Sequence, residues 1–244
     1  MARFLLSAIS AVVLSALQLS AQPAFERDII KTSAGDLEIT FIGHGTLMMR
    51  FAGKTIHIDP WSRLADYGSL PKADLILITH QHSDHLDLHA VDQIRTERTV
   101  ILLTQKCAEE LKGKVMKNGD VQTVFGIKIE AVPAYNIVHR RPGDGPFHPK
   151  GEGNGYILTF GTTRVYVAGD TENTPEMKAL KNISVAFLPM NLPYTMTPEM
   201  VADAAKSFKP KILYPYHTGD TDTKSLANLL SKGTSIEVRF RKMQ

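Results

Sequence analysis

The sequence of 244 residues contains one cysteine, Cys107, and can therefore form no disulfide within the chain. A lone cysteine followed by Ala108 and Leu111 in a predicted helix is more commonly a small buried apolar side chain than a nucleophile. The fold must accordingly depend on a hydrophobic core, and a chain of this length is long enough to bury one.

Neither sign of charge dominates the sequence. It has 28 basic and 25 acidic side chains and a formal net charge of +3, with no basic run interleaved with aromatic residues. Because nucleic-acid binding needs such concentrated positive charge, nucleic acid is not an expected partner. The sequence also lacks a serine nucleophile elbow and a phosphate-binding glycine loop, which would indicate other kinds of chemistry.

Long apolar runs are absent except at the N-terminus. A short basic start at residues 1–3 precedes an almost wholly apolar stretch over residues 4–19, and the small residues Ser20 and Ala21 follow. This pattern is typical of a secretory signal peptide. An uncleaved membrane anchor is the alternative, but the run is short for a span of ~20 residues. We therefore expect a signal peptide at 1–21 and a mature domain at 22–244, periplasmic or secreted, with no stable membrane span after cleavage.

The remaining sequence predicts a single α/β domain. Extended segments separated by glycine turns come first, and strands then alternate with helices. Strands are predicted at 37–42, 46–51, 54–58, 74–78, 100–103, 121–124, 127–132, 156–160, 164–167, 184–188, 212–216 and 236–240. Helices are predicted at 88–95, 106–111 and 223–230, and from Thr197-Pro198, where a hydroxyl N-cap precedes proline. Two sheets packed face to face, with helices outside, form a stable arrangement for this pattern.

An irregular stretch at 136–154 interrupts this order. It is rich in glycine and proline and carries His139, His148, Arg140 and Arg141. A loop of this length in a compact domain is usually functional or disordered. We expect it to cover a pocket and to help select the substrate. The two arginines favour an acidic substrate if they face that pocket, and are simply solvated if they do not.

The clearest chemical signal is the segment Thr79-His80-Gln81-His82-Ser83-Asp84-His85, directly after the predicted strand at 74–78. In an extended segment, residues two apart face the same side, so His80 and His82 can bind one cation together. Asp84 and His85 are adjacent and point apart, which suits a second cation beside the first. Imidazole and carboxylate groups are good zinc ligands, and imidazole also binds iron and manganese. This density of histidine makes an ordinary surface loop the weaker interpretation.

The spacing H-x-H-x-D-H in this segment resembles the signature motif of the metallo-β-lactamase superfamily. The resemblance extends from about residue 36 to residue 220 and implies a four-layer αββα sandwich. It implies that His148 joins the first metal, that Asp170 bridges both metals and that His217 joins the second. It further implies that Asp59, without binding metal itself, orients one of the metal ligands.

Several of these assignments have alternatives. His139 competes with His148 in the same loop, Asp170 is otherwise a turn residue after Gly169, and Asp59 is otherwise a strand-terminal cap. His44 is either a structural residue near the first turn or a donor that faces the substrate. The remaining candidates line either the pocket or the core, where buried tyrosine is the commoner outcome; they are Tyr135, Asn136 and Tyr194.

Four shorter stretches resemble one subgroup of the superfamily, which includes ascorbate 6-phosphate lactonase-like proteins and, more distantly, N-acyl phosphatidylethanolamine phospholipase D. They are residues 43–46, 133–136, 147–156 and 194–199. Penicillin-hydrolysing members usually have cysteine in place of Asp170, which disfavours that activity. The helical extension of glyoxalases, the inserted domain of RNA-processing members and the flavin domain of oxygen-reducing members have no counterpart in this sequence.

The resemblance thus implies a metal-dependent hydrolase with two metals, zinc by preference and manganese or iron otherwise. A hydroxide held by both metals would attack an ester, lactone, amide or phosphodiester bond of a small-molecule substrate. Asp84, His44 and Tyr194 are expected to take part in catalysis, the last two by a hydrogen bond to the developing charge. Two other functions stay open: a periplasmic metal-binding protein without turnover, and an iron-dependent redox enzyme with the same ligands.

The N-terminal pattern predicts export. N-terminal sequencing of the protein from its native host should begin near Gln22, because a signal peptidase would cut after small residues such as Ala21. Recovery from the cytoplasm of a chain that retains Met1 or Ala2 would contradict this expectation.

Overall fold

The computed structural model describes residues 25–243. The expected signal peptide at 1–21 lies outside the described residues and stays a prediction. Between residues 25 and 243, no helix combines the length and the apolar character that crossing a membrane would require.

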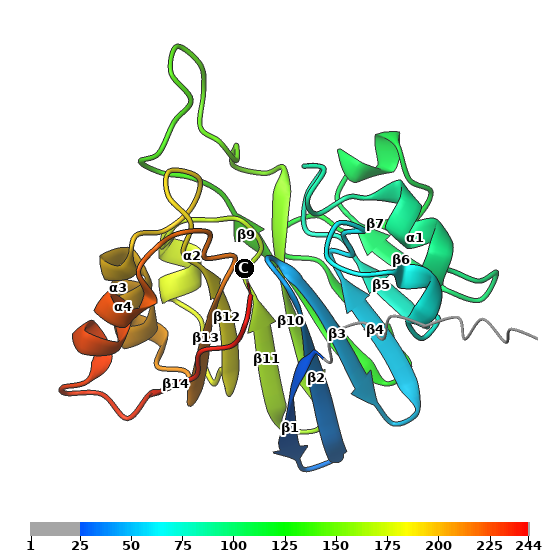
Figure 1. The fold of residues 1–244 in the computed structure, drawn as a ribbon, viewed down its shortest axis with the longest axis horizontal. Coiled ribbons are helices and arrows are strands. Elements are labelled where there is room, and N and C mark those ends of the chain that lie inside the picture. Colours follow the sequence, from blue (N-terminus) through cyan, green and yellow to red (C-terminus); the bar gives the residue numbers. More distant parts are fainter. Residues whose placement is uncertain (1–24, 244) are drawn as a thin grey trace, which may run out of the picture.

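Two seven-stranded sheets form the body of the domain (Figure 1). Strands β1 to β7 make the first sheet and β8 to β14 the second, with spatial neighbours following chain order. Each sheet pairs its first four strands antiparallel and the rest parallel. The strands are β1 (Glu26–Thr32), β2 (Gly35–Gly43), β3 (Thr46–Phe51), β4 (Lys54–Ile58), β5 (Leu75–Leu77), β6 (Val100–Leu103), β7 (Lys114–Val115), β8 (Val121–Val124), β9 (Ile127–Ala134), β10 (Gly153–Phe160), β11 (Thr163–Val167), β12 (Val185–Pro189), β13 (Ile212–Tyr216) and β14 (Glu237–Val238).

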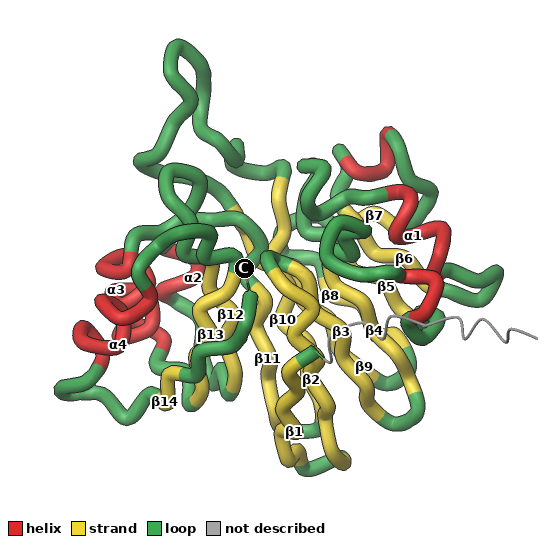
Figure 2. Tube along the Cα trace, viewed as in Figure 1, coloured by secondary structure: helices red, strands yellow, loops and turns green. Residues whose placement is uncertain are grey.

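Helices cover the outer faces of both sheets (Figure 2). The first sheet carries α1 (Leu88–Ile94) with the 3-10 turns η1 (Tyr67–Ser69) and η2 (Cys107–Glu109); the second carries α2 (Pro175–Lys178), α3 (Pro198–Phe208) and α4 (Thr223–Leu230). One apolar cluster lies between the sheets, and two others lie beneath the helices. The fold is therefore the predicted four-layer αββα arrangement in a single domain.

Aromatic rings join the two sheets. Phe187 of β12 stacks on Tyr214 of β13 with ring centroids 4.9 Å apart, and Phe41 of β2 lies 5.1 Å from the same tyrosine. Aromatic pairs stabilise a core beyond the area that they bury. These contacts set the position of one sheet relative to the other.

The parallel strands end where the chemically interesting residues begin. The segments after β4, β5, β11, β12 and β13 carry, in order, Asp59, His80, Asp170, Asn191 and His217. Parallel strands of one sheet place their carboxyl ends at a common edge, which is where ligands bind in open α/β sheets. The topology therefore gathers residues from distant parts of the sequence at one edge of the sandwich.

The predicted helix at 106–111 is wrong. Only the single turn η2 forms, because the chain enters β7 three residues after Leu111. Sequence analysis missed this short strand. Cys107 is buried, as expected, and burial raises the pKa of its thiol to about 11.

The edge strands also differ from expectation. β14 covers two residues rather than 236–240, because only Glu237 and Val238 pair in register with β13 before a last backbone hydrogen bond from Arg239 to Leu213 at 2.8 Å. Sequence analysis also missed β1, which is charged and leaves Ile29 exposed, and the one-turn helix α2. Pairing with β2, not an apolar pattern, keeps β1 in the sheet.

Candidate metal centre

The segment after β5 turns back on itself instead of staying extended. His85 and Leu86 donate backbone hydrogen bonds to the carbonyl of His82 at 2.9 and 2.8 Å. The turn leaves His80 Nε2 3.1 Å from His82 Nδ1 and Asp84 Oδ2 3.7 Å from His85 Nε2. The expectation that Asp84 and His85 point apart is therefore wrong, because the turn directs both side chains to the same point.

Three imidazoles form a first group, made of His80, His82 and His148. One nitrogen of each lies within 4.8 Å of the others. His148 comes from the irregular loop, a few residues before β10. The competing His139 instead places its Nδ1 2.7 Å from Glu172 Oε1. The loop thus brings His148, not His139, to this group.

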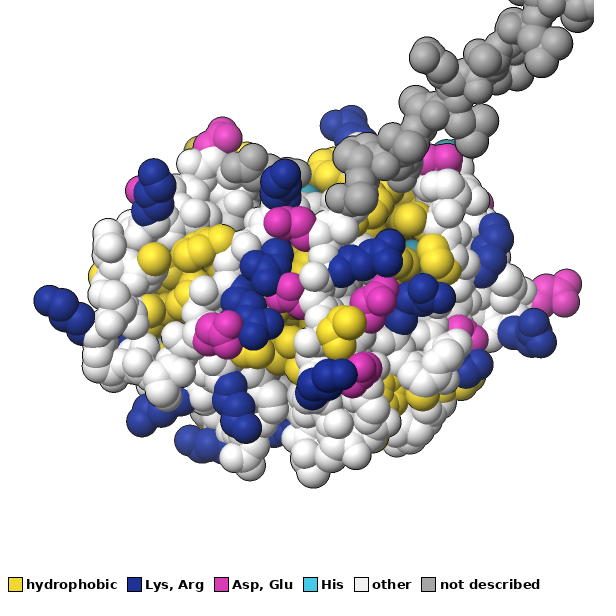
Figure 3. Space-filling view, turned by 60° about the horizontal axis from the view of Figure 1, so that its bottom comes forward, with side chains coloured by type: hydrophobic (Ala, Val, Ile, Leu, Met, Phe, Trp, Pro, Cys, Tyr) yellow, Lys and Arg dark blue, Asp and Glu magenta, His cyan; other side chains and the backbone are white. Residues whose placement is uncertain are grey.

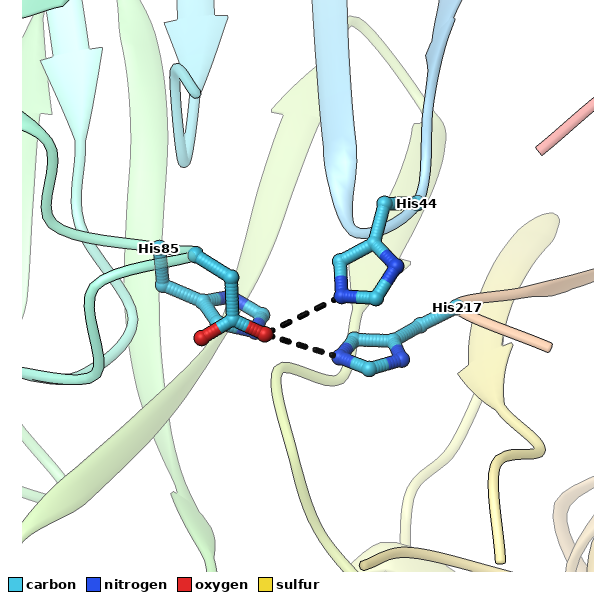
Figure 4. A group of neighbouring side chains, drawn as sticks. His44, His85 and His217 are labelled. Carbon is cyan, nitrogen blue, oxygen red and sulfur yellow. Dashed lines mark hydrogen bonds and ion pairs between the residues drawn. The ribbon is translucent and has the colours of Figure 1, made fainter. Parts of the chain in front are cut away.

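A second group contains His44, Asp84, His85 and His217, whose ligand atoms also lie within 4.8 Å of one another. Asp84 Oδ2 is 3.0 Å from His44 Nε2 and 3.6 Å from His217 Nε2. Figure 4 shows the labelled His44 and His217 rings beside each other, with a dashed line from each to one carboxylate oxygen, which marks the two contacts of Asp84 Oδ2 just given. Their ring centroids are 3.6 Å apart.

Asp170 lies between the two groups. Its Oδ2 is 3.3 Å from His148 Nε2 and 3.4 Å from His217 Nε2, and its Oδ1 is 3.5 Å from His85 Nε2. The carboxylate is buried. With His80 Nε2 4.0 Å from Oδ2, it therefore lies beside two imidazoles of the first group and two of the second.

Two glycines permit this close packing. A Cβ at Gly45 would lie 2.8 Å from His85 Cε1. Gly169 has a φ of +65°, and a Cβ there would lie 2.9 Å from the carbonyl oxygen of Asn154. Glycine is required at both positions because any side chain would displace the groups beside it.

Four of the imidazoles form hydrogen bonds through Nδ1, the ring nitrogen that faces away from the centre. Their partners are Thr79 for His80 at 3.0 Å, Asp59 for His85 at 2.8 Å, Asn136 for His148 at 2.7 Å, and the Asn191 amide for His217 at 3.2 Å. Such contacts fix ring orientation and leave the opposite nitrogen facing the centre. Sequence analysis anticipated the position of Asp59 but missed Thr79 and Asn191, and considered Asn136 only as a pocket residue.

Four buried polar atoms at the centre have no hydrogen-bond partner among the described residues. They are Nε2 of His85, His148 and His217, and Oδ1 of Asp170. Buried polar atoms in native proteins are nearly always satisfied, so this convergence calls for a bound group. Imidazole and carboxylate donors suit a divalent cation such as zinc, and the residues present fit one.

Burial keeps the His80 and His82 imidazoles neutral. It holds the pKa of His80 well below its usual value, and lowers the pKa of His82 to about 4. His85 is the exception: burial opposes its protonation, but three carboxylates raise its pKa to about 9. These carboxylates are Asp170, Asp59 and Asp84.

The carboxylates are held in their ionised form. Burial opposes ionisation of Asp84, but the close His217 and His44 imidazoles outweigh it and hold its pKa far below the usual range. Burial likewise opposes ionisation of Asp170, and the neighbouring imidazoles, led by His217, again prevail. The centre therefore offers ionised carboxylates and, at His80 and His82, neutral imidazoles, the forms in which these side chains bind metals, whereas His85 must first lose its proton.

A pocket of about 450 Å³ lies over both groups, and Arg141, Phe147 and Tyr194 belong to its wall. Arg141 Nη2 is 3.3 Å from His82 Nε2. Arg140 instead forms an isolated antiparallel β-bridge with Pro146 and does not belong to the pocket wall. Tyr194 packs edge-on against Phe147, so it is a pocket residue rather than a core residue.

One buried carboxylate, Glu172, anchors the irregular loop. It accepts hydrogen bonds from three consecutive backbone amides at residues 137–139, each at 2.7 Å, and from Asn136 Nδ2 at 3.0 Å. Asn136 in turn holds His148, so the loop and this imidazole share one support. Sequence analysis missed Glu172, which no motif marks.

Comparison with known proteins agrees with this geometry. The sequence matches the beta-lactamase superfamily domain family over residues 38–217. A UPF0173 metal-dependent hydrolase of Koribacter versatilis (strain Ellin345) is 32% identical over 199 residues, which cover 75% of this chain and 84% of the relative. Another, from Pelotomaculum thermopropionicum, is 29% identical over 84% of this chain and 96% of the relative.

Solved structures agree as well. A protein of Parabacteroides distasonis ATCC 8503, proposed to be a metal-dependent hydrolase, superimposes with a TM-score of 0.86 and 52% identity, covering 90% of this chain and all of that one. Igni18, a metallo hydrolase from Ignicoccus hospitalis, gives a TM-score of 0.69 at 25% identity, covering 85% of this chain and 95% of that one. The chain therefore belongs to the metallo-β-lactamase superfamily and, within it, to the UPF0173 family of metal-dependent hydrolases.

Proposed function

We propose that the protein is a hydrolase that works with two divalent cations, zinc by preference. The observation that carries this proposal is the convergence of four buried, unpartnered ligand atoms between two groups of imidazoles and carboxylates. Manganese and iron accept the same donors. The assigned ligands are His80, His82 and His148 for the first cation, Asp84, His85 and His217 for the second, and Asp170 for both.

Cations bound in such a centre lower the pKa of water and polarise the bond under attack. The chain's own residues then have distinct roles. His44 contacts Asp84 at 3.0 Å and also belongs to the pocket wall, and we assign it the orientation of that carboxylate. Tyr194 lies on the pocket wall, and we assign it the hydrogen bond to charge that develops on the substrate.

The pocket favours a small molecule that carries negative charge. Its volume of about 450 Å³ is typical of small-molecule sites. Arg141 supplies a guanidinium on the wall, next to His82, which suits a phosphate or carboxylate. The bond cleaved is an ester, lactone, amide or phosphodiester. The resemblance of residues 43–46 and 194–199 to ascorbate 6-phosphate lactonase-like proteins keeps lactones in this set.

Two other functions would use the same ligands: passive metal binding in the periplasm, and redox chemistry with iron. Membership of a family of metal-dependent hydrolases favours hydrolysis over both. Export to the periplasm or the medium belongs to the proposal and rests on residues 1–21 of the sequence.

The ligand assignment predicts how single variants lose metal. The unmodified protein should hold about two zinc ions per chain. The Asp84→Ala variant should lose chiefly the second ion and keep the first, and the His82→Ala variant should lose chiefly the first ion and keep the second. Mass spectrometry of dialysed protein measures this directly. His89→Ala, an exposed histidine on α1, is the matched control and should keep both ions.

Turnover provides the second half of that test. Hydrolysis of an aryl ester or a phosphodiester should stop on treatment with a chelator and return with zinc. Full metal retention in both ligand variants would contradict the assignment, and turnover that survives complete metal removal would contradict the proposed function.

The raised pKa of His85 predicts that binding of the second cation releases a proton. With a pKa of about 9, His85 is protonated at neutral pH, and a cation at Nε2 must displace that proton. Apparent affinity for the second ion should therefore increase with pH, by up to about tenfold per unit, and level off near pH 9. Calorimetry in buffers of different ionisation enthalpy should detect about one proton released at pH 7; an affinity that does not change between pH 6 and 9 would argue against this state of His85.

The position of Arg141 predicts a selective loss on anionic substrates. Arg141→Gln should lower kcat/KM by about 10- to 100-fold for a substrate with a phosphate or carboxylate, since a charged hydrogen bond is lost. Neutral substrates and metal content should change little. Arg140→Gln is the control because Arg140 lies outside the pocket wall. Equal effects of Arg141→Gln on both substrate classes would remove the charge argument.

A further inference from the structure

The segment Arg239–Met243, called the strap below, leaves β14 and runs back to the middle of the molecule (Figure 1). It ends at the turn between β2 and β3, which carries His44. The strap follows every proposed ligand in the sequence, yet it reaches the edge of the sandwich where those ligands gather.

The strap is fastened to the first sheet through Asp28 of β1. Arg241 Nη2 donates to both oxygens of this carboxylate at 2.7 Å, and Arg239 Nη1 donates at 3.3 Å. Tyr214 of β13 donates its hydroxyl to the same carboxylate. The backbone amide of Lys242 donates to Glu26 Oε2 at 2.6 Å. These contacts hold the strap along its length and join β1 of one sheet to β13 of the other.

The end of the strap is buried. The Met243 side chain is 1% exposed and belongs to the apolar cluster between the sheets. Its carbonyl accepts a hydrogen bond from the His44 amide at 3.0 Å, and the His44 carbonyl accepts one from the His217 amide at 2.9 Å. A continuous line of backbone hydrogen bonds therefore runs from Met243 through His44 to His217.

Both histidines in this line have strained backbones. The φ angles are +49° for His44 and +47° for His217, in the left-handed region that residues other than glycine rarely adopt. Such conformations persist only where the surroundings enforce them. The hydrogen bonds from His44 to Met243 and from His217 to His44 provide that enforcement.

His44 in turn contacts two ligands of the second group, Asp84 and His217, and so fixes their positions. Its Nε2 lies 3.0 Å from Asp84 Oδ2, and its ring lies 3.6 Å from that of His217 (Figure 4). The first group has separate supports, since Thr79 holds His80 and Asn136 holds His148.

We propose that the strap is a positioning element for the second cation, acting through His44 on Asp84 and His217. This inference rests on the proposed two-cation centre. Met243 thus has a positioning role for the metal site: its carbonyl and its buried side chain hold His44, and none of its atoms is a proposed metal ligand. A strap that served only overall stability would instead affect both cations alike.

The test compares three variants with the unmodified full chain. Deletion of residues 243–244 removes the carbonyl that binds His44, Met243→Ala removes the buried anchor, and Asp28→Asn loosens the strap far from the metals. Each is titrated with zinc against a competing chelator, and its melting temperature is recorded. Met243→Leu is the conservative variant, and Ile94→Ala, in the buried cluster under α1, controls for loss of stability alone.

We expect the Kd of the second zinc ion to rise at least about tenfold in the three strap variants, as when other supports of metal ligands are lost, while the first changes by less than about threefold. Met243→Leu should bind the second zinc ion with nearly the affinity of the unmodified chain. Ile94→Ala should lower the melting temperature without weakening the second zinc ion more than the first. Unchanged binding in Met243→Ala and Asp28→Asn, or parallel weakening of both ions, would overturn the inference. An unmodified protein that binds fewer than two ions would instead refute the two-cation centre, and the role of the strap with it.

Discussion

A single buried carboxylate, Asp170, faces imidazoles supplied by both sheets, and its charge must be compensated where it lies. It is 5% exposed, and an ionised group at that depth is stable only beside compensating positive charge. His85 comes from the first sheet and His217 from the second, at 3.5 and 3.4 Å. Compensation therefore requires the sheets to keep their relative position, which the ring contacts between Phe41, Phe187 and Tyr214 provide from within the core.

Around this centre, hydrogen bonds to the remote ring nitrogens fix the orientation of the imidazoles. Asp59 accepts from the Thr79 amide at 2.8 Å and from its hydroxyl at 2.6 Å, and it also contacts His85 at 2.8 Å. The ends of β4 and β5 are thereby joined to one ring of the centre. Because the partners behind the rings lie on different strand ends, the position of each ligand depends on the sheet rather than on the flexibility of its own loop.

The layered fold and the histidine-rich segment after β5 could be predicted from the sequence, since a dense histidine motif after a buried strand is a local signal. The more distant candidates His148, Asp170 and His217 came only from the resemblance of that motif to the metallo-β-lactamase superfamily. Facts that depend on the path of the chain could not be predicted. The turn at His82 overrides the alternation expected of an extended segment, so Asp84 and His85 converge. The contact of His44 with Asp84 joins residues 40 positions apart, and that of Met243 with His44 spans most of the chain. The edge strand β1 has no apolar pattern that could reveal it in the sequence, since pairing with β2 and the ion pairs of Asp28 hold it in the sheet.

The anchoring of the loop by Glu172 has a consequence for how such a protein can diverge. Three of its hydrogen bonds are accepted from backbone amides at residues 137–139, and every amino acid except proline supplies that donor. The exposed side chains of Ile137 and Val138 can therefore be exchanged without loosening the anchor, whereas the His139 ring contacts Glu172 itself at 2.7 Å. Because Glu172 also binds Asn136, which holds His148, the loop that supplies Arg141 and Phe147 to the pocket wall can acquire new side chains while the His148 ring stays in place. Selection can thus act on the choice of substrate separately from the chemistry.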